Sequence, residues 1–539
     1  MAGLFSSLNM SSSALKVHQA GISIVSNNIS NMNTEGYHKQ KLNLGTLTLD
    51  LPIGNNVMNQ VKTSAGVEAI SVTRYTTTFI GSYYRDQLTD QAYLEQQKKA
   101  VTDLAEMFDE LGGRGLDSAL EGFYEALDNL NQYPSDMSAR INFLEAAETL
   151  TSSMNSISNN LNNIKNLSVG DGSSPESLQQ SELYTSVQSL NDYLQQLANI
   201  NKQLSNSQTG TLENNNLLDR RDLILNEISK LAEFKTTIHD DGSVTLTLGG
   251  TKIVSGNKVL ATFDVQTATK YDEYCQQNGI DNNNECNAVI RLVKESGSVI
   301  ENVNNRFDTG KIGGIISSAT PGDGVNVNSV LDNLDTLAQT IADVFNELQT
   351  RDGAFYIDNV DGNVQLSNED LDQYVIFTTS DGSAEITAGN ISINSLLTEG
   401  DGYNKIAAAY FEDYDPTAPD PLANIDLNAI GNANNIIAMI NTKTDNTSAA
   451  FDAIGNIPLS DYYSGIISKV NAAVTSATNA ADAQDAVVQS LDNKTAEQTS
   501  VDLNEELTDL VKFQTAYSAS ARVFTTCNTL LDTLVNLGL

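Results

Sequence analysis

The sequence predicts a mainly α-helical protein with β-rich inserts, in which terminal coiled-coil helices accompany a long helical-bundle body. Apolar residues recur every seven positions near both chain ends, which is the spacing of a coiled coil. In two internal stretches the pattern changes to alternation, which is the spacing of β-strands. At 539 residues, the chain is long enough for several domains of ordinary size.

The two ends of the chain carry matching apolar rows. The N-terminal row comprises Leu4, Leu8, Leu15, Ile22, Val25, Ile29 and Met32. The C-terminal row comprises Leu503, Leu510, Phe513, Tyr517, Phe524, Cys527, Leu531 and Leu534. Isolated helices of this length gain little stability without a packed face, so we expect the ends to pack on each other or on neighbouring subunits. The residues predicted to carry self-assembly are Leu8, Leu15, Ile22, Val25, Ile29, Leu503, Leu510, Phe513, Tyr517, Phe524, Leu531 and Leu534.

Between the ends, helical spacing of apolar residues predicts long antiparallel helices in a bundle. The rows are Leu94, Val101 and Phe108; Leu150, Met154, Ile157, Leu161 and Ile164; Leu183, Val187, Leu190, Leu194, Leu197 and Leu204; and Val330, Leu334, Leu337, Ile341, Val344 and Leu348. Pro175 suits the first turn of a helix and Ser174 suits its N-cap. A helix is therefore expected to begin at this point.

The first β-rich stretch is expected after Phe234. There Val244, Leu246 and Leu248 alternate with threonine behind an Asp-Asp-Gly turn signal. The stretch is expected to end near Phe307, before glycines that mark the return to helix.

A second β-rich stretch, rich in Gly and Asp, is expected from Asp352 to Asp401. Helices are then expected to resume near Ile406 and to include an alanine-rich helix from Ile466 to Leu491. The expected domains are a terminal coiled-coil assembly domain (1–45 with 496–539), a helical-bundle domain (46–235 with 310–351 and 402–495), a β-rich subdomain (236–309) and a small β-rich insert (352–401).

The charge of the chain limits its partners. It has 30 Lys plus Arg against 68 Asp plus Glu, a formal net charge of −38, which repels nucleic acid and anionic lipid. No run approaches the ~20 apolar residues of a membrane span, and no cleavable signal peptide opens the sequence. We expect no nucleic-acid partner and no membrane span.

Residues that could carry chemistry are few and scattered. His18, His38 and His239 form no metal-ligand spacing, and His18 falls on the N-terminal apolar row. Cys275 and Cys286 could pair as a loop disulfide or remain free thiols. The common nucleotide, metalloprotease and hydrolase motifs do not occur in the sequence. We therefore predict no catalytic, cofactor or metal site and no enzymatic activity.

One N-terminal string carries a specific resemblance. Residues 26–40 read Ser-Asn-Asn-Ile-Ser-Asn-Met-Asn-Thr-Glu-Gly-Tyr-His-Lys-Gln and resemble the motif shared by flagellar rod, hook and hook-associated proteins. The motif residues are Asn27, Asn28, Asn31, Gly36 and Tyr37. Asn and Ser side chains can end a helix by bonding to the backbone, and Gly36 permits a turn.

Two further segments support the resemblance. Residues 501–523 are similar to the C-terminal segment of the same family. Residues 218–224 resemble an Asp-x-Arg-Asp stretch of the junction proteins within it, although the residue after Asp219 is commonly Gln and here is Arg220. The β-rich stretches have no detailed match.

The resemblance implies a structural axial subunit of the bacterial flagellum that joins hook to filament by polymerising through its terminal helices. It implies secretion through the flagellar type III apparatus and no cofactor. The implied partners are other copies in a junction ring, the hook protein, a second junction protein (hook-associated protein 3) and an export chaperone. The chaperone is expected to cover the apolar stripe of Phe513, Tyr517, Phe524 and Leu531.

Two alternatives remain at the level of sequence. The chain could be a hook or distal-rod protein of the same family, although the 219–222 stretch and the long internal helices argue against this. It could also be a flagellar subunit with an enzymatic or adhesive β-rich insert, but no residue pattern locates an active site.

Overall fold

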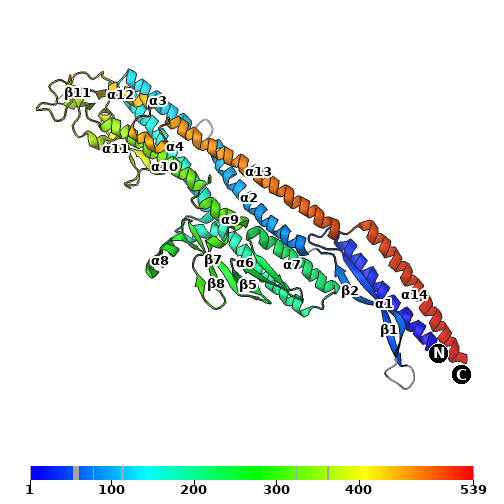
Figure 1. Ribbon diagram of the computed structural model, residues 1–539. Coiled ribbons are helices and arrows are strands. Elements are labelled where there is room, and N and C mark those ends of the chain that lie inside the picture. Colours follow the sequence, from blue (N-terminus) through cyan, green and yellow to red (C-terminus); the bar gives the residue numbers. More distant parts are fainter. Residues whose placement is uncertain are drawn as a thin grey trace.

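The computed structural model describes residues 2–52, 60–76, 78–110, 115–282, 284–322, 324–360 and 363–537. The molecule is elongated, with both chain ends together at one tip and the insert around β11 at the other (Figure 1). Most of the described residues lie in helices, and the sheets are small. The predicted fold class, helices with β-rich inserts, is confirmed.

Two long antiparallel helices form the tip at the chain ends. Helix α1 (Ala2–Asn31) packs along α14 (Leu503–Leu537), as Figure 1 shows in blue and red. Strands β1 (Gln40–Pro52) and β2 (Gln60–Arg74) pair as an antiparallel hairpin beside α1. We call α1, the hairpin and α14 the terminal unit, and the rest of the chain the body.

The hairpin corrects the sequence analysis, which assigned residues from 46 onward to a helical bundle. Leu42 and Leu44 already alternate with polar residues, as a strand requires. The alternation is interrupted at Gly45 and Thr46, and the pairing shifts register between Asn43 and Leu44. A β-bulge of this kind hides the period of two from a simple reading of the sequence.

Helices α2 (Thr78–Glu110) and α13 (Leu459–Thr499) run side by side from the terminal unit into the body (Figure 1). They are joined by polar contacts, such as Lys98 Nζ to Asp482 Oδ1 at 3.1 Å. The alanine-rich helix predicted from Ile466 to Leu491 is confirmed, because these residues lie within α13, which is longer at both ends. It ends at Thr499, and Asp502 accepts hydrogen bonds from the backbone N–H groups of Asn504 and Glu505 in the first turn of α14.

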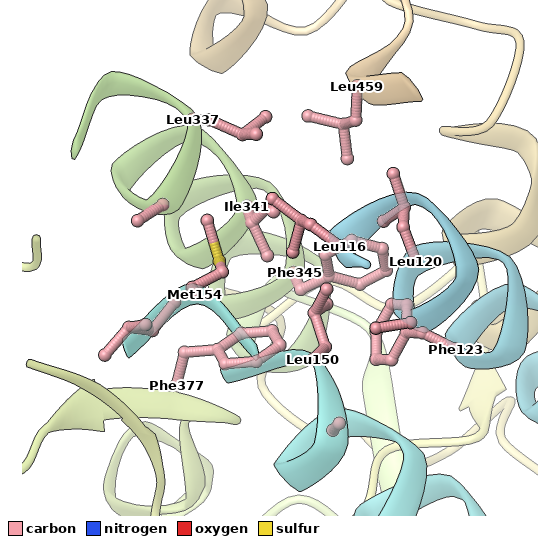
Figure 2. Close-up of a cluster of buried hydrophobic side chains, with 14 of the residues drawn as sticks. Leu116, Leu120, Phe123, Leu150, Met154, Leu337, Ile341, Phe345, Phe377 and Leu459 are labelled. Atoms are coloured by element: carbon pink, nitrogen blue, oxygen red, sulfur yellow. The ribbon is translucent and has the colours of Figure 1, made fainter. Parts of the chain in front are cut away.

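The largest core lies at the far end of the body. It is formed by α3 (Leu116–Gln132), α4 (Met137–Val169), α10 (Val327–Thr350), α12 (Asn434–Asn441) and the start of α13. Figure 2 shows Phe123, Phe345 and Phe377 converging there. The ring centroids of Phe123 and Phe345 lie 4.9 Å apart in an edge-to-face arrangement. The predicted rows of α4 and α10 face this core.

A second core lies between helices and two sheets. Its helices are α5 (Pro175–Gln180), α6 (Glu182–Asn206), α7 (Leu212–Leu231) and α9 (Gly310–Ala319). Helix α8 (Ala268–Asn278) contributes instead to a small separate cluster of Tyr271, Cys275 and Val289. One sheet has the order β3 (Lys235–Ile238), β4 (Val244–Leu248), β5 (Thr251–Ser255), β6 (Lys258–Val259); the other has the order β7 (Ala261–Thr267), β8 (Ala288–Lys294), β9 (Val299–Ile300). Ser174 caps α5, as predicted, and the strands after Phe234 are confirmed.

The second β-rich insert extends further than predicted. Its strands are β10 (Ala354–Val360), β11 (Asn363–Ser367), β12 (Phe377–Thr379), β13 (Ile391–Ile393) and β14 (Ala409–Tyr410), with a short α11 (Ser395–Thr398). The expected return to helix near Ile406 is wrong, because after a 3₁₀ turn ending at Lys405 the next α-helix begins at Asn434. Pro416, Pro419 and Pro421 lie in between, and proline lacks the N–H that a helix needs.

Candidate functional site: a polar joint between the terminal helices and the body

Helices α1 and α14 approach each other closely at Gly21 of α1, which has no side chain. A Cβ on Gly21 would lie 2.7 Å from the ring of Phe513, so the ring packs directly on the α1 backbone. The ring of His18 lies 6.3 Å from the same phenylalanine. One heptad along each helix, Asn28 Nδ2 donates to Glu506 Oε2 at 2.9 Å. Gly21 and Asn28 therefore mark the line along which the two helices touch.

The predicted assembly residues lie around this line in different positions. Val25 is buried, Phe513 packs on Gly21 of α1, and Leu510, Phe524 and Leu531 are partly buried. Leu8, Leu15, Ile22 and Ile29 are also only partly buried, and Leu503, Tyr517 and Leu534 are exposed. The contact line on α1 is thus one residue away from the leucine row. A row of small residues at Ser7, Ala14 and Gly21 is the sequence signal that could have located it.

Asn28 joins three segments through a fully satisfied side chain. Its Oδ1 accepts hydrogen bonds from Tyr37 Oη at 2.7 Å and from the Gln40 backbone N–H at 3.1 Å. Its Nδ2 donates to the Gln40 carbonyl at 2.9 Å as well as to Glu506. A buried amide with two donors and two acceptor sites occupied has little freedom to move. This asparagine fixes the end of α1, the start of β1 and α14 relative to one another.

The remaining motif residues shape the turn after α1. Asn31 Nδ2 donates to the Asn27 carbonyl at 2.9 Å, which closes the last helical turn. Gly36 has φ +73°, a left-handed conformation that favours glycine. Burial, together with the carboxylates of Asp219 and Glu506, raises the pKa of Tyr37, so its hydroxyl remains a donor to Asn28. The motif thus has a structural role, which is to bring Tyr37 and the following strand back against α1.

Lys39 connects the turn to the C-terminal helices. Its Nζ lies 2.6 Å from Glu505 Oε2 and 3.3 Å from Glu506 Oε1. Its backbone N–H donates to the Thr499 carbonyl at the end of α13, at 2.8 Å. Burial alone would lower the pKa of Lys39, but the two glutamates outweigh burial and raise it. The lysine therefore stays charged and holds the break between α13 and α14 against β1.

The hairpin is held on the body by a buried carboxylate, that of Asp219 in α7. Asp219 Oδ1 in α7 lies 2.7 Å from His38 Nδ1 and 2.7 Å from Arg74 Nε, at the two ends of the hairpin. Arg74 Nη2 also lies 3.1 Å from His38 Nδ1. One ring nitrogen cannot both donate to the carboxylate and accept from the guanidinium, and we assign the proton to the Nδ1–Asp219 bond.

Asp222 and Arg221, one turn further along α7, extend the cluster. Arg74 Nη2 donates to Asp222 Oδ2 at 2.7 Å, and Arg221 Nη2 donates to Asp222 Oδ1 at 2.6 Å. Burial by itself would raise the pKa of Asp222, but Arg221 and Arg74 outweigh it and hold the pKa below its usual range. Burial by itself would lower the pKa of Arg74, but the carboxylates of Asp222 and Asp219 outweigh it and raise that pKa. Every charge at this position is therefore compensated by a neighbour.

Gln40 completes the connection to α7. Its Nε2 donates to Asn216 Oδ1 at 2.9 Å, and its Oε1 accepts from Asn215 Nδ2 at 3.1 Å. Asn215 Nδ2 also donates to the Val72 carbonyl of β2 at 3.0 Å. We call the set Asn28, Tyr37, His38, Lys39, Gln40, Arg74, Asn215, Asp219, Arg221, Asp222, Glu505 and Glu506 the joint. It runs without interruption from α14, through the end of α1 and the base of the hairpin, to α7.

The joint brings together motifs that the sequence analysis treated separately. The 26–40 string and the 218–224 stretch lie far apart along the chain, yet His38 and Asp219 are in direct contact. Arg220, the departure from the family pattern, is exposed and makes none of the joint's contacts given above. Nothing in either motif alone indicates that the other is its partner.

The remaining candidate residues lie outside the joint. His239 Nε2 is 2.9 Å from Thr245 Oγ1 in the first β-rich region. Cys275, Cys286 and Cys527 are buried free thiols, and burial raises the pKa of Cys286. Among the described residues, no group of three or more His, Cys, Asp or Glu is arranged to hold a metal ion. No helix in the described part of the chain is long and apolar enough to cross a membrane.

Three family models match segments of the chain. Residues 101–362 match the helical domain of flagellar hook-associated protein FlgK, residues 8–38 match the flagella basal body rod protein model, and residues 493–537 match the C-terminal model of flagellar basal body rod FlgEFG proteins. Each matched segment contributes to the joint, through Asp219, His38 and Glu506 respectively.

Similar proteins match along nearly the whole chain. The sequence is 26% identical to flagellar hook-associated protein 1 of Bacillus subtilis, covering 99% of each chain. It is 25% identical to flagellar hook-associated protein 1 of Salmonella typhimurium, covering 98% of this chain and 99% of that one. The solved structure of the flagellar hook junction protein FlgK from Burkholderia pseudomallei is similar in fold, with a TM-score of 0.54, 15% identity, and coverage of 78% of this chain and 100% of that one.

Proposed function

Because this chain belongs to the family of flagellar hook-associated protein 1, structural components of the flagellar axis at the junction of hook and filament, we propose that it polymerises through the outer faces of α1 and α14. The observation that carries the proposal is the incomplete burial of these two helices. Their apolar residues remain accessible after α1 and α14 have packed on each other.

The exposed apolar residues lie on both helices. On α14 they are Leu503, Leu507, Val511, Tyr517, Val523, Leu530, Leu534 and Val535, and on α1 they include Phe5 and Met10. Fully burying one such side chain contributes roughly 1.5–3 kcal/mol at most. A neighbouring subunit that covers several of them supplies enough free energy to offset the cost of association.

The distribution of charge favours the same surface. Copies that each carry a net charge of −38 repel one another, so contact is least costly where charge is sparse. Within Ala2–Asn31, Lys16 is the only Asp, Glu, Lys or Arg residue. Helix α1 is therefore a nearly neutral surface on a strongly acidic protein.

The joint gives this assembly surface a defined orientation. Its buried ion pairs hold the hairpin and α1 on α7, so the angle between the terminal unit and the body is set within one subunit. In a ring of copies, that angle decides where each body lies relative to the axis. The joint is thus proposed as an orienting element rather than as a contact between subunits.

The proposed partners are further copies of this chain, the hook protein and a second junction protein (hook-associated protein 3). Export through the flagellar type III apparatus belongs to the same proposal. The hook or distal-rod alternative is less well supported, because residues 101–362 match the FlgK helical domain. Among the described residues of the second β-rich insert, no arrangement favours an enzymatic or adhesive role.

An export chaperone is proposed to cover Phe513, Tyr517, Phe524 and Leu531. Phe513 packs on Gly21 in the subunit, so part of this stripe is already occupied by α1. Chaperone binding and α1 packing are therefore expected to compete for α14. A chain ending at Gln498 should lose chaperone binding, and undiminished affinity would place the chaperone site elsewhere.

Assembly can be tested with a double substitution on the outer flank of α1. Leu15→Asp with Ile22→Asp places two charges in the proposed subunit contact, where an unpaired buried charge costs several kcal/mol. Both side chains are only partly buried in the single subunit, so its circular dichroism and melting should stay near those of the parent. Polymer formation, measured by sedimentation and electron microscopy, should be lost.

The matched control places the same two charges on the body. Leu167 and Met137 in α4 are exposed, and Leu167→Asp with Met137→Asp should leave polymerisation unchanged. Normal polymers from the Leu15 and Ile22 double variant would refute the proposed surface. Loss of polymers in both double variants would indicate a general effect of added charge.

A further inference from the structure

Two contacts fix the register of α1 against α14. Gly21 meets Phe513, and Asn28 meets Glu506, which is seven residues further along α1 and seven residues back along α14. Antiparallel helices with this pairing share one heptad repeat. Continued by two heptads toward the chain ends, the same register places Ser7 opposite Cys527.

The apolar pattern alone does not select this register. Both helices carry rows with a seven-residue repeat, so a shift by one heptad would again match apolar residues with apolar residues. The rows could equally pair between α1 of one copy and α14 of another, as in a domain swap. Something other than apolar spacing must distinguish the observed pairing from these alternatives.

Asn28 and Glu506 are the polar exception in this contact. Glu506 is 2% exposed and Asn28 is 1% exposed, and in the observed register each satisfies the other, with Lys39 at 3.3 Å from the Glu506 carboxylate. A shift by one heptad would put Asn28 opposite Phe513 and would carry Glu506 past the end of α1. The Asn28 amide would then lose its hydrogen bond to α14, and the Glu506 carboxylate would lose both Asn28 and Lys39, which is the costly outcome.

We propose that the Asn28–Glu506 pair, supported by Lys39, specifies the register in which α1 and α14 pair within one subunit. The inference rests on the proposed function, because it names the residues that keep the assembly surface in a single arrangement. A single polar residue in a coiled-coil contact can specify register at some expense of stability. The backbone N–H of Lys39 also donates to the Thr499 carbonyl at the end of α13. The register of α1 against α14 is thereby fixed relative to the body of the same chain.

The test uses Cys527 as a native cross-linking reporter in the full-length chain. Ser7→Cys should form a disulfide with Cys527 only in the observed register, whereas Ala14→Cys should reach Cys527 only after a shift of one heptad. In the parent background we expect cross-linking within the chain from Ser7→Cys and little from Ala14→Cys. Cys275 and Cys286 are buried in the body and remain unchanged.

The same reporters are then placed in Asn28→Leu with Glu506→Leu, which replaces the polar pair by an apolar pair. The ratio of Ser7→Cys to Ala14→Cys cross-linking should fall by about tenfold, while helix content by circular dichroism is retained. Glu506→Gln is the conservative control, because its amide oxygen still accepts from Asn28, and it should keep the parent ratio.

The inference is overturned if the apolar double variant keeps the parent ratio of cross-links. It is also overturned if both cross-links disappear, because the pair would then be needed for pairing itself rather than for its register. Cross-linked dimers from the double variant would support it, since they report pairing between copies. These measurements use the isolated subunit, so they are independent of whether the Leu15 and Ile22 variant polymerises.

Discussion

Helices α4 and α14 have nearly equal lengths of 33 and 35 residues, but they bury very different surfaces. In α4, a continuous face from Ala139 to Val169 is buried, whereas among the described side chains of α14 only Glu506 and Cys527 are buried. Helix α4 is enclosed by other elements of its own chain, and α14 has only α1 on one side. The comparison indicates that the body is complete as a single chain, and it supports the proposal that other molecules cover the terminal unit.

The first way to test this comparison is to damage the body core alone. Phe345→Ala removes a fully buried ring that packs edge to face on Phe123 (Figure 2), and should cost about 3–5 kcal/mol of the free energy of unfolding. Chemical denaturation followed by circular dichroism measures this loss. Polymer formation should persist at temperatures where the variant body is still folded. Loss of polymers under those conditions would show that the two regions are not independent.

The second prediction concerns the joint, which connects the two regions. Asp219→Asn keeps one acceptor oxygen but removes the charge facing His38 and Arg74, and should cost about 1–3 kcal/mol of local stability. Amide hydrogen exchange should then be faster at the base of the hairpin, around Val72, than in the parent. The main body core should exchange at its parent rate.

A matched ion pair outside the joint serves as the control. Asp264 and Arg291 are joined at 2.5 Å across β7 and β8, but both are about a third exposed. Asp264→Asn should therefore change stability by less than about 1 kcal/mol. If Asp219→Asn is equally mild and leaves hairpin exchange unchanged, the joint does not orient the terminal unit.

The third prediction concerns the terminal unit and is measured by polymerisation rather than by the stability of the subunit. Leu530→Ala truncates an exposed side chain of α14 and should raise the concentration needed for polymerisation by about tenfold or less, because roughly 1 kcal/mol of burial between subunits is lost. The unfolding of the isolated subunit should not change. Leu396→Ala, an equally exposed leucine in α11 of the insert, should change neither property. Equal effects of the two substitutions on polymerisation would contradict the assignment of the surface.

The sequence was most informative where one face of an element is buried. The rows of α4, α6 and α10 could be predicted because each helix places its apolar residues at helical spacing against a core. The hairpin was missed because its bulges interrupt the alternation. In the terminal unit, the leucine row of α1 was found, but the contact with α14 is made one residue away, at Gly21 and Asn28. The sequence alone does not distinguish apolar residues that stay exposed on the subunit from apolar residues that pack within the chain.

The joint could not be assembled from sequence for a different reason. His38 and Asp219 belong to separate motifs, and their contact exists only because the hairpin folds back on α7. Short polar motifs give the chemistry of each side but not the partner, since that depends on tertiary arrangement. The three family models match segments that contain these motifs, but the pairing among the motifs comes from the structure.

The smallest expected effect is a dependence of the α1/α14 contact on pH. His18 lies beside Phe513, its Nδ1 is buried without a hydrogen-bond partner, and burial lowers its pKa from the model-peptide value of about 6.5. A histidine with a lowered pKa binds a proton more weakly when the helices are paired than when they are apart. Its contribution is therefore fully present above about pH 6.5 and is lost progressively as the pH falls below that value.

Amide exchange in α1, or polymer stability, measured between pH 5 and pH 8 should show this loss. His18→Leu removes the titrating group from the contact and should flatten the profile. His239→Leu, in the first β-rich region, should leave the profile as it is in the parent. The body should show no matching change, because the described core around Phe123 and Phe345 contains no histidine. An unchanged profile in His18→Leu would mean that a group other than His18 controls the response to pH.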